Sequence, residues 1–267
     1  MLKNIKHYNE RSRFPSEVIV VRHGQSKQNV HAIQEIKFPR IVDRLYSLFG
    51  EYISFKFTQV VDHMRNKKTL LGIPDKDVPL TDAGADQAAR TARELIKNRI
   101  IPDVILSSSF KRAVQTTEIM RCAFMQEGFP LSMYTHDFLR EKSEGENDGI
   151  PRTYLKHIRR IGAKLFYEQG HLRYRPKGGE NAHDVYVRIL NDLERTLMNY
   201  PNKKVMIVAH GMTNMCIDLA LMHEDIKKAI DNKWYRMPNL AITRYLYSAD
   251  KEHWLRDEEL QRTSLIP

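Results

Sequence analysis

The sequence has no long apolar run and very few cysteines. No stretch of its 267 residues is apolar for long enough to cross a bilayer, which excludes a protein built on membrane-spanning helices. The polar and basic start, residues 1–15, lacks the apolar centre of a secretory signal, so we expect a cytoplasmic protein. Cys122 and Cys216 lie among apolar neighbours in helical patterns, and we expect two buried thiols rather than a disulfide or a metal site.

The chain also lacks the signs of a domain boundary. We find no internal repeat, no low-complexity tract and no linker rich in proline, serine and glycine, so we predict one domain over residues 1–267. The net charge of +10 fits a nucleic-acid surface, an anionic lipid surface or a cationic cleft for phosphorylated substrates. Lysine and arginine are spread along the chain rather than gathered in one tail, which makes nucleic-acid binding the weaker alternative.

Short apolar runs alternate with amphipathic segments through most of the chain. Strands are expected at 17–22, 102–108, 131–135, 203–211 and 240–247, and helices at 81–98, 110–127, 182–200 and from about Thr213. Thr81 is the expected N-cap of the first of these helices. The alternation predicts an α/β fold, a three-layer sandwich in which helices flank a mostly parallel central sheet.

Two segments interrupt the alternation, residues 31–72 and residues 140–180. The first holds aromatic-rich pieces that fit amphipathic helices, and the second is rich in charge and glycine. Long insertions over the carboxyl ends of strands usually shape the ligand site, so we expect helical insertions that cap the active site. The alternative is a pair of surface elaborations that do not contact a ligand.

Two of the predicted strands end in a histidine followed by a glycine. Arg22, His23 and Gly24 follow the first strand, and His210 and Gly211 follow the strand at 203–211. Ligands bind outside the carboxyl ends of strands in open α/β sheets. Two histidines in equivalent positions therefore favour a functional site over two ordinary loop residues.

Arg112 lies in the first turn of the helix that follows a third strand. The helix dipole favours anions at that end, so the dipole does not explain an arginine there. One interpretation is an ion pair with a nearby aspartate or glutamate. The other, which we prefer, is a pocket for a dianion built from Arg112, Arg22 and helix N-terminal amides.

Six blocks of sequence share one order along the chain. They are RHGQSKQN (22–29), PLTDAGADQA (79–88), SSSFKRAVQTTE (107–118), LRE (139–141), GGEN…DVYVRI (178–189) and VAHG (208–211). Together they resemble the motifs of the histidine phosphatase superfamily in its phosphoglycerate-mutase-like branch. An isolated RHG is a weak signal, whereas six blocks in register over roughly residues 18–247 are specific.

The resemblance implies a phosphatase that works through a phosphohistidine. His23 would attack phosphorus, while Arg22, Arg112 and His210 would hold the phosphoryl group and lower the pKa of the nucleophile. Glu141 matches the general acid that protonates the leaving group. Three other carboxylates compete for that role: Glu144, Glu146 and Asp148.

The resemblance also implies phosphate-binding roles for residues around these groups. Asn29 would contact phosphate, whereas Ser26 would contact phosphate or only cap a helix. Gly24 and Gly211 would let the backbone turn and approach the phosphate. Glu180 would organise the pocket, with a carboxylate that only satisfies a helix N-terminus as the alternative.

The chain departs from its family in ways that bear on function. Gln25 replaces a glutamate found in many relatives, and the aromatic segments typical of the cofactor-dependent mutases are missing. We therefore expect a phosphate monoesterase, with a mutase or a non-catalytic binder of phosphorylated ligands as alternatives. We expect no cofactor and no metal, a small phosphorylated substrate as partner, and neither nucleic acid nor membrane; a homodimer stays open.

Overall fold

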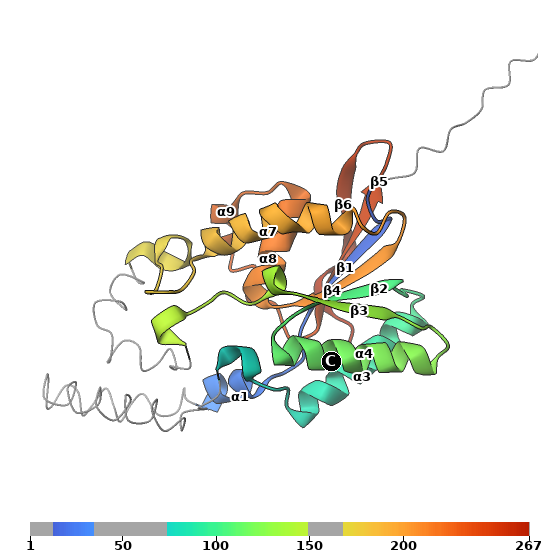
Figure 1. Ribbon diagram of the computed structural model, residues 1–267, viewed down its shortest axis with the longest axis horizontal. Helices are drawn as coiled ribbons and strands as arrows, with labels where there is room; N and C mark the ends of the chain where they lie inside the picture. The colour runs from blue at the N-terminus through green and yellow to red at the C-terminus, as the bar shows by residue number, and fades with distance from the viewer. Residues whose placement is uncertain (1–12, 35–73, 149–167, 267) are drawn as a thin grey trace, which may run out of the picture.

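The computed structural model describes residues 13–34, 74–148 and 168–266, the side chains of 31–34 excepted. In chain order, with η for 3-10 helices, the elements are β1 (Glu17–Arg22), α1 (Lys27–Gln34), η2 (Asp75–Asp77), α3 (Asp82–Lys97), β2 (Val104–Ser108), α4 (Lys111–Gln126), β3 (Ser132–His136), η3 (Asp137–Leu139), η4 (Gly145–Asn147), α7 (Ala182–Leu197), β4 (Lys204–Ala209), α8 (Gly211–Met222), α9 (Ile226–Asp231), β5 (Ala241–Ser248) and β6 (His253–Ser264). They form three layers, with helices on both faces of one sheet (Figure 1).

The sheet has six strands in the order β3-β2-β4-β1-β5-β6. The pairs β1–β4, β2–β4 and β2–β3 are parallel, whereas β5 and β6 pair antiparallel at one side. The expected α/β fold with a mostly parallel sheet between helices is confirmed. The carboxyl ends of β1, β2 and β4 lie side by side, which is the place where the predicted site residues follow their strands.

Strand β1 shows why its sequence is continuously apolar. Val18 and Val20 pack on one side with the buried residues of α7 and α8. Ile19 and Val21 pack on the other side with the buried residues of α3 and α4. A strand covered on both faces by helices has no solvent side, so no polar residue interrupts it.

Side-chain caps set two of the helix starts. Thr81 Oγ1 accepts a hydrogen bond from Gly84 N at 3.0 Å, which confirms the predicted N-cap of α3. At α7, the side chain of Asn181 and that of Asp184 each accept from the other residue's backbone amide, both at 2.9 Å. Helix α8 begins at Gly211, two residues before the expected start, so His210 stands at its N-cap position.

The expectation for the cysteines is partly wrong, and the expectation for the two insertions falls mostly outside the described residues. Cys216 is buried, but Cys122 is exposed on α4, so the expectation of two buried thiols was wrong for Cys122. Most of the predicted insertion at 31–72, and residues 149–167 of the one at 140–180, lie outside the described residues. The capping role of both segments and the single domain over 1–267 stay predictions. In the part of the chain that is described, no helix is long and apolar enough to span a membrane.

Candidate active site

Three neighbouring strands deliver the candidate catalytic groups to one place. Arg22 ends β1 and His23 follows it, and His210 follows β4. The two histidine rings meet edge-on, with centroids 5.0 Å apart. Arg112, from the first turn of α4 after β2, donates from Nε to His23 Nε2 at 3.3 Å. The structure thus brings together residues that are far apart in the sequence.

The hydrogen bonds of His23 determine which ring nitrogen carries the proton. His23 Nδ1 lies 2.7 Å from the carbonyl oxygen of Gly24, which can only accept, so Nδ1 carries the hydrogen. The lone pair therefore sits on Nε2, on the side of Arg112. Burial lowers the pKa of His23 well below 6.5, and the charges of Arg112 and Arg22 lower it further. The sequence pointed to the cations alone, whereas burial of the ring is the larger cause.

Arg112 has the ion pair that the sequence left as an alternative. Its guanidinium binds the carboxylate of Asp75 through two contacts, Nη1 to Oδ1 at 3.0 Å and Nη2 to Oδ2 at 3.2 Å. Arg112 Nη1 also donates to the backbone oxygen of Asp75 at 2.7 Å. The arginine therefore lies between Asp75 and Nε2 of His23.

Arg22 and His210 each have one buried nitrogen without a hydrogen-bond partner among the described residues. These atoms are Arg22 Nε and His210 Nδ1. Arg22 Nη1 donates to the carbonyl oxygen of Met237, and His210 Nε2 lies 2.8 Å from Ser108 Oγ. Buried nitrogens normally find a partner. Two unpartnered ones beside His23 fit groups that a bound anion would satisfy.

The hydroxyl of Ser108 favours the tautomer of His210 that carries its hydrogen on Nδ1. Ser108 Oγ accepts from Phe110 N at 3.2 Å, and its own hydrogen is available for donation to His210 Nε2. The proton of a neutral ring then sits on Nδ1, the unpartnered nitrogen. Burial lowers the pKa of His210 well below 6.5, with Arg112 and His23 as further causes, so the ring is neutral.

Glu141 lies within the electrostatic reach of both arginines. Burial is the largest effect on its carboxyl group and raises its pKa above 4.5. The negative charge of Asp75 acts in the same direction, while Arg112, Arg22 and a 2.9 Å hydrogen bond from Lys142 N oppose it. A raised pKa keeps more of this carboxyl protonated near neutral pH, as a general acid requires.

The carboxylates of Glu144 and Asp148, which competed for the same role, have contacts of their own. Glu144 forms an ion pair with Lys142 at 2.8 Å, and Asp148 Oδ2 lies 3.5 Å from the backbone nitrogen of Asp75. Glu141 combines burial and a raised pKa with electrostatic interaction with Arg112 and Arg22. The geometry therefore favours Glu141 as the proton donor.

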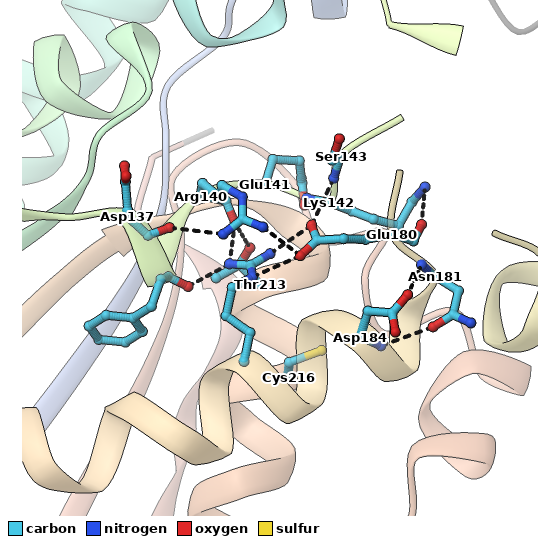
Figure 2. Close-up of polar contacts among 12 residues, drawn as sticks. Asp137, Arg140, Glu141, Lys142, Ser143, Glu180, Asn181, Asp184, Thr213 and Cys216 are labelled. Carbon is cyan, nitrogen blue, oxygen red and sulfur yellow. Dashed lines mark hydrogen bonds and ion pairs between the residues drawn. The ribbon is translucent and has the colours of Figure 1, made fainter. Parts of the chain in front are cut away.

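Glu180 lies next to the segment 140–143, which carries Glu141 (Figure 2). Its Oε1 accepts from Arg140 Nη2 at 2.7 Å and from Arg188 Nε at 3.0 Å. Its Oε2 accepts from Arg188 Nη2 at 3.1 Å and from Ser143 N at 3.0 Å. Both oxygens are therefore bound to protein groups, which supports the organising role expected for this carboxylate.

Arg188 extends this network to the backbone on the other side of Glu141. Its Nη1 donates to the carbonyl oxygens of Phe138 at 2.5 Å and Arg140 at 3.1 Å. Thr213 Oγ1 also donates to the carbonyl oxygen of Arg140, at 2.7 Å. The backbone before Glu141 is thus held by side chains from α7 and α8, and Ser143 after it is held by Glu180, which restricts where the carboxyl group of Glu141 can point.

Close backbone contacts explain the two glycines of the motifs. A Cβ atom at Gly24 would lie 2.7 Å from the carbonyl oxygen of Gly84, and one at Gly211 would lie 2.5 Å from that of Tyr235. Gly24 N donates to Thr116 Oγ1 at 3.0 Å. In this structure the glycines serve the packing of loops around the site, while their expected contact with phosphate stays a prediction.

Ser26 and Asn29 hold the loop after His23. Ser26 is buried, and both its backbone nitrogen and its hydroxyl donate to Asn29 Oδ1 at 3.0 Å. Asn239 Nδ2 donates to the same oxygen at 3.3 Å and to the carbonyl oxygen of His23 at 2.9 Å. The carbonyl end of the Asn29 side chain therefore braces the loop, and its expected contact with phosphate stays a prediction.

Sequence analysis did not single out Asp75, Asn239 or Arg188 as individual site residues. Asn239 reaches His23 across 216 positions, and it lies in an ordinary-looking turn before β5. Asp75 lies in a short polar segment, PDKD, that reads as a loop. Arg188 lies in the sequence block 178–189, and its place in that block was the only sign in the sequence that it belongs to the site.

Comparison with known proteins identifies the family of the chain. The family model described as histidine phosphatase superfamily (branch 1) matches residues 64–258, which is more than half of the chain. The chain belongs to the histidine phosphatase superfamily. The matched segment includes Arg112, Glu141 and His210, whereas Arg22 and His23 precede it.

Individual members of the superfamily match parts of the chain. Phosphoglycerate mutase-like protein 4 of Arabidopsis thaliana is 32% identical over 137 residues, which cover 51% of this chain and 56% of that protein. The uncharacterized phosphatase PhoE of Bacillus subtilis (strain 168) is 30% identical over 135 residues, which cover 51% of this chain and 60% of that protein. These matches span little more than half the length of either relative.

A solved phosphatase structure shares the fold over nearly the whole chain. Mycobacterial glucosyl-3-phosphoglycerate phosphatase, solved in complex with VO3, superposes with a TM-score of 0.60 at 21% identity. The alignment covers 91% of this chain and 97% of the mycobacterial one. At this identity the likeness supports the fold and leaves the substrate open.

Proposed function

We propose that this histidine phosphatase hydrolyses phosphate monoesters through a phosphohistidine on His23, with Glu141 as the proton donor. The observation that carries the proposal is the state of the His23 ring. Its Nδ1 hydrogen is held by the carbonyl of Gly24, and its low pKa leaves Nε2 as a free base beside Arg22 and Arg112. A buried, uncharged imidazole with its lone pair among cations is suited to attack phosphorus.

The proposed reaction has two steps. In the first, His23 Nε2 attacks phosphorus, the ester P–O bond breaks, and Glu141 gives its proton to the departing oxygen. In the second, the Glu141 carboxylate takes a proton from water, whose oxygen attacks phosphorus and breaks the P–N bond. Arg22, Arg112 and the Nδ1–H of His210 would balance charge on the phosphoryl oxygens in both steps.

The products distinguish hydrolysis from the mutase alternative. With 3-phosphoglycerate as substrate, the proposal predicts that free phosphate accumulates in step with the loss of ester. A mutase would instead give an isomerised phosphoglycerate, and a non-catalytic binder would give neither product. If the wild-type protein hydrolysed no activated aryl phosphate between about pH 4 and 8, the catalytic proposal would be wrong.

We propose that the reaction needs no metal ion and that its substrate is small. Within residues 13–34, 74–148 and 168–266, no group of three or more His, Cys, Asp or Glu side chains is placed to hold a metal. Treatment with EDTA is therefore expected to leave the rate unchanged, and a loss that added divalent ions restore would overturn this part of the proposal. Nucleic acid and membrane remain outside the proposed partners, and a cytoplasmic location and a homodimer remain open to experiment.

Arg188 is expected to be a positioning residue for Glu141. Lysine at this place keeps the charge but cannot bridge the carboxylate of Glu180 and the two carbonyl groups at once. We expect Arg188→Lys to slow hydrolysis of alkyl phosphates by about tenfold while nitrophenyl phosphate is less affected. The measurement is kcat for both substrates over pH, because a misplaced acid changes the alkaline limb of the profile.

Arg195→Lys is the matched control. Arg195 lies on the same helix, is exposed, and pairs with Asp192 at 2.6 Å. It is expected to keep wild-type rates and pH profiles. Equal losses at Arg188 for both substrates, with no change in the alkaline limb, would mean that Arg188 only supports the fold.

A further inference from the structure

Arg112 is bound on two sides in this structure. Its Nη atoms hold the carboxylate of Asp75, and its Nε holds the lone pair of His23 Nε2. We propose that Asp75 is an internal competitor for phosphate, which occupies the arginine that a phosphoryl group must bind and leaves it when substrate enters. This inference rests on the proposed function, because it assumes that phosphate binds between Arg112 and His23.

The contact between Asp75 and Arg112 has the geometry by which arginine binds phosphate. Two parallel N–H groups meet two oxygens, at 3.0 and 3.2 Å, as in paired recognition of carboxylate or phosphate. The side chains are only 3% exposed for Arg112 and 18% exposed for Asp75, so water screens the pair weakly. A carboxylate in this position satisfies the same donors that a phosphoryl oxygen would use.

Attack on phosphorus needs the lone pair of His23 Nε2, which Arg112 Nε holds at 3.3 Å. Arg112 Nε must therefore turn from His23 toward a phosphoryl oxygen. A phosphoryl group that also takes the paired Nη donors displaces the carboxylate of Asp75 from them. A dianion that approached while Asp75 stayed in contact would also face its negative charge at close range.

Asp75 lies on a short element that can move away from Arg112. The 3-10 helix η2 has three residues, Asp75–Asp77, and none of them is buried. Beyond Arg112, the backbone nitrogen of Asp75 lies 3.5 Å from Asp148 Oδ2, and its carbonyl oxygen accepts from Val78 N at 3.4 Å. Movement of the Asp75 side chain would break its ion pair with Arg112, and a phosphoryl group would replace that ion pair with its own.

The competition predicts how the site ranks its ligands. A ligand whose phosphoryl group is its main contact must displace Asp75 without help, and inorganic phosphate, the product, is such a ligand. A substrate with further groups bound elsewhere in the site has additional binding energy to offset the displacement. Asp75 would thus weaken product inhibition and favour substrates with a second anchor over bare phosphate.

The test compares Asp75→Asn with Asp77→Asn. Both variants remove one negative charge from η2, but Asp77 is exposed, whereas the carboxylate of Asp75 binds the guanidinium of Arg112. Binding of inorganic phosphate is measured by calorimetry and as competitive inhibition of nitrophenyl phosphate hydrolysis. We expect Asp75→Asn to bind phosphate about tenfold more tightly than wild type, and Asp77→Asn to stay within about twofold.

Asp75→Ala serves as a second variant, and thermal unfolding checks that each protein is folded. Tighter phosphate binding in both Asp75 variants supports the competition. Unchanged or weaker binding in folded Asp75 variants overturns it, because Asp75 would then stay beside Arg112 and help to orient it. If wild type and all variants neither bind phosphate nor hydrolyse the aryl ester, the proposed function itself fails, which is a different result from the loss of the Asp75 effect alone.

Discussion

His23→Ala is expected to abolish hydrolysis of every phosphate ester. The variant removes the nitrogen that forms the covalent bond to phosphorus, so the two-step route closes and only residual stabilisation by the cations remains. We expect kcat to fall by about a thousandfold or more for good and poor leaving groups alike. The loss should not depend on the leaving group, because the first step cannot begin. Initial rates with nitrophenyl phosphate and with an alkyl phosphate measure it.

His183→Ala is the matched control for this experiment. His183 is exposed on α7, and its loss is expected to leave the rates unchanged. His23 is buried, so thermal unfolding of the alanine variant must show that the protein still folds. A folded His23→Ala protein that kept most of its activity would place the nucleophile elsewhere.

Glu141→Gln is expected to divide substrates by their leaving groups. An alkoxide needs a proton as it departs, whereas nitrophenolate leaves without one, so the variant should slow alkyl phosphates by about a hundredfold and nitrophenyl phosphate much less. Glutamine keeps the size and polarity of the side chain. The matched control is Glu144→Gln in the same loop, since Glu144 pairs with Lys142. Equal losses on both substrates would exclude Glu141 as the acid.

The pH dependence of activity gives an independent test of the roles proposed for His23 and Glu141. Because the pKa of His23 is lowered, the nucleophile stays neutral and activity is retained until the pH falls well below 6.5. Because the pKa of Glu141 is raised above 4.5, the acid stays protonated to higher pH, and activity declines as the pH rises through that raised value. In Glu141→Gln the alkaline decline for alkyl phosphates should disappear, which a kcat/KM profile of wild type and variant would show.

The fold was predictable where local pattern and tertiary structure agree. The parallel strands are covered on both faces, so each reads as an apolar run that ends at the site. Strand β6 was not predicted, because it lies at the edge of the sheet and only Trp254 is buried in it. A strand with one buried side chain carries no alternation that sequence analysis can recognise.

The site was predictable to the extent that its residues sit at strand ends. His23, Arg112 and His210 follow three strands that lie next to one another, so the topology alone brings them together. The contacts of Asp75 and Asn239 depend on how separate loops pack, which no local pattern encodes. The pKa of His23 shows the same division, because its charged neighbours can be read from the sequence while the burial that dominates it cannot.

The most direct test of the account is to trap the phosphorylated enzyme. The protein is mixed with a labelled phosphate ester, quenched in base within milliseconds to seconds, digested and analysed by mass spectrometry. The account predicts one phosphoryl group on the peptide that contains His23, stable in base and lost in acid, and absent from His23→Ala. Turnover without any phosphorylated peptide, or with the phosphoryl group on a different residue, would contradict it.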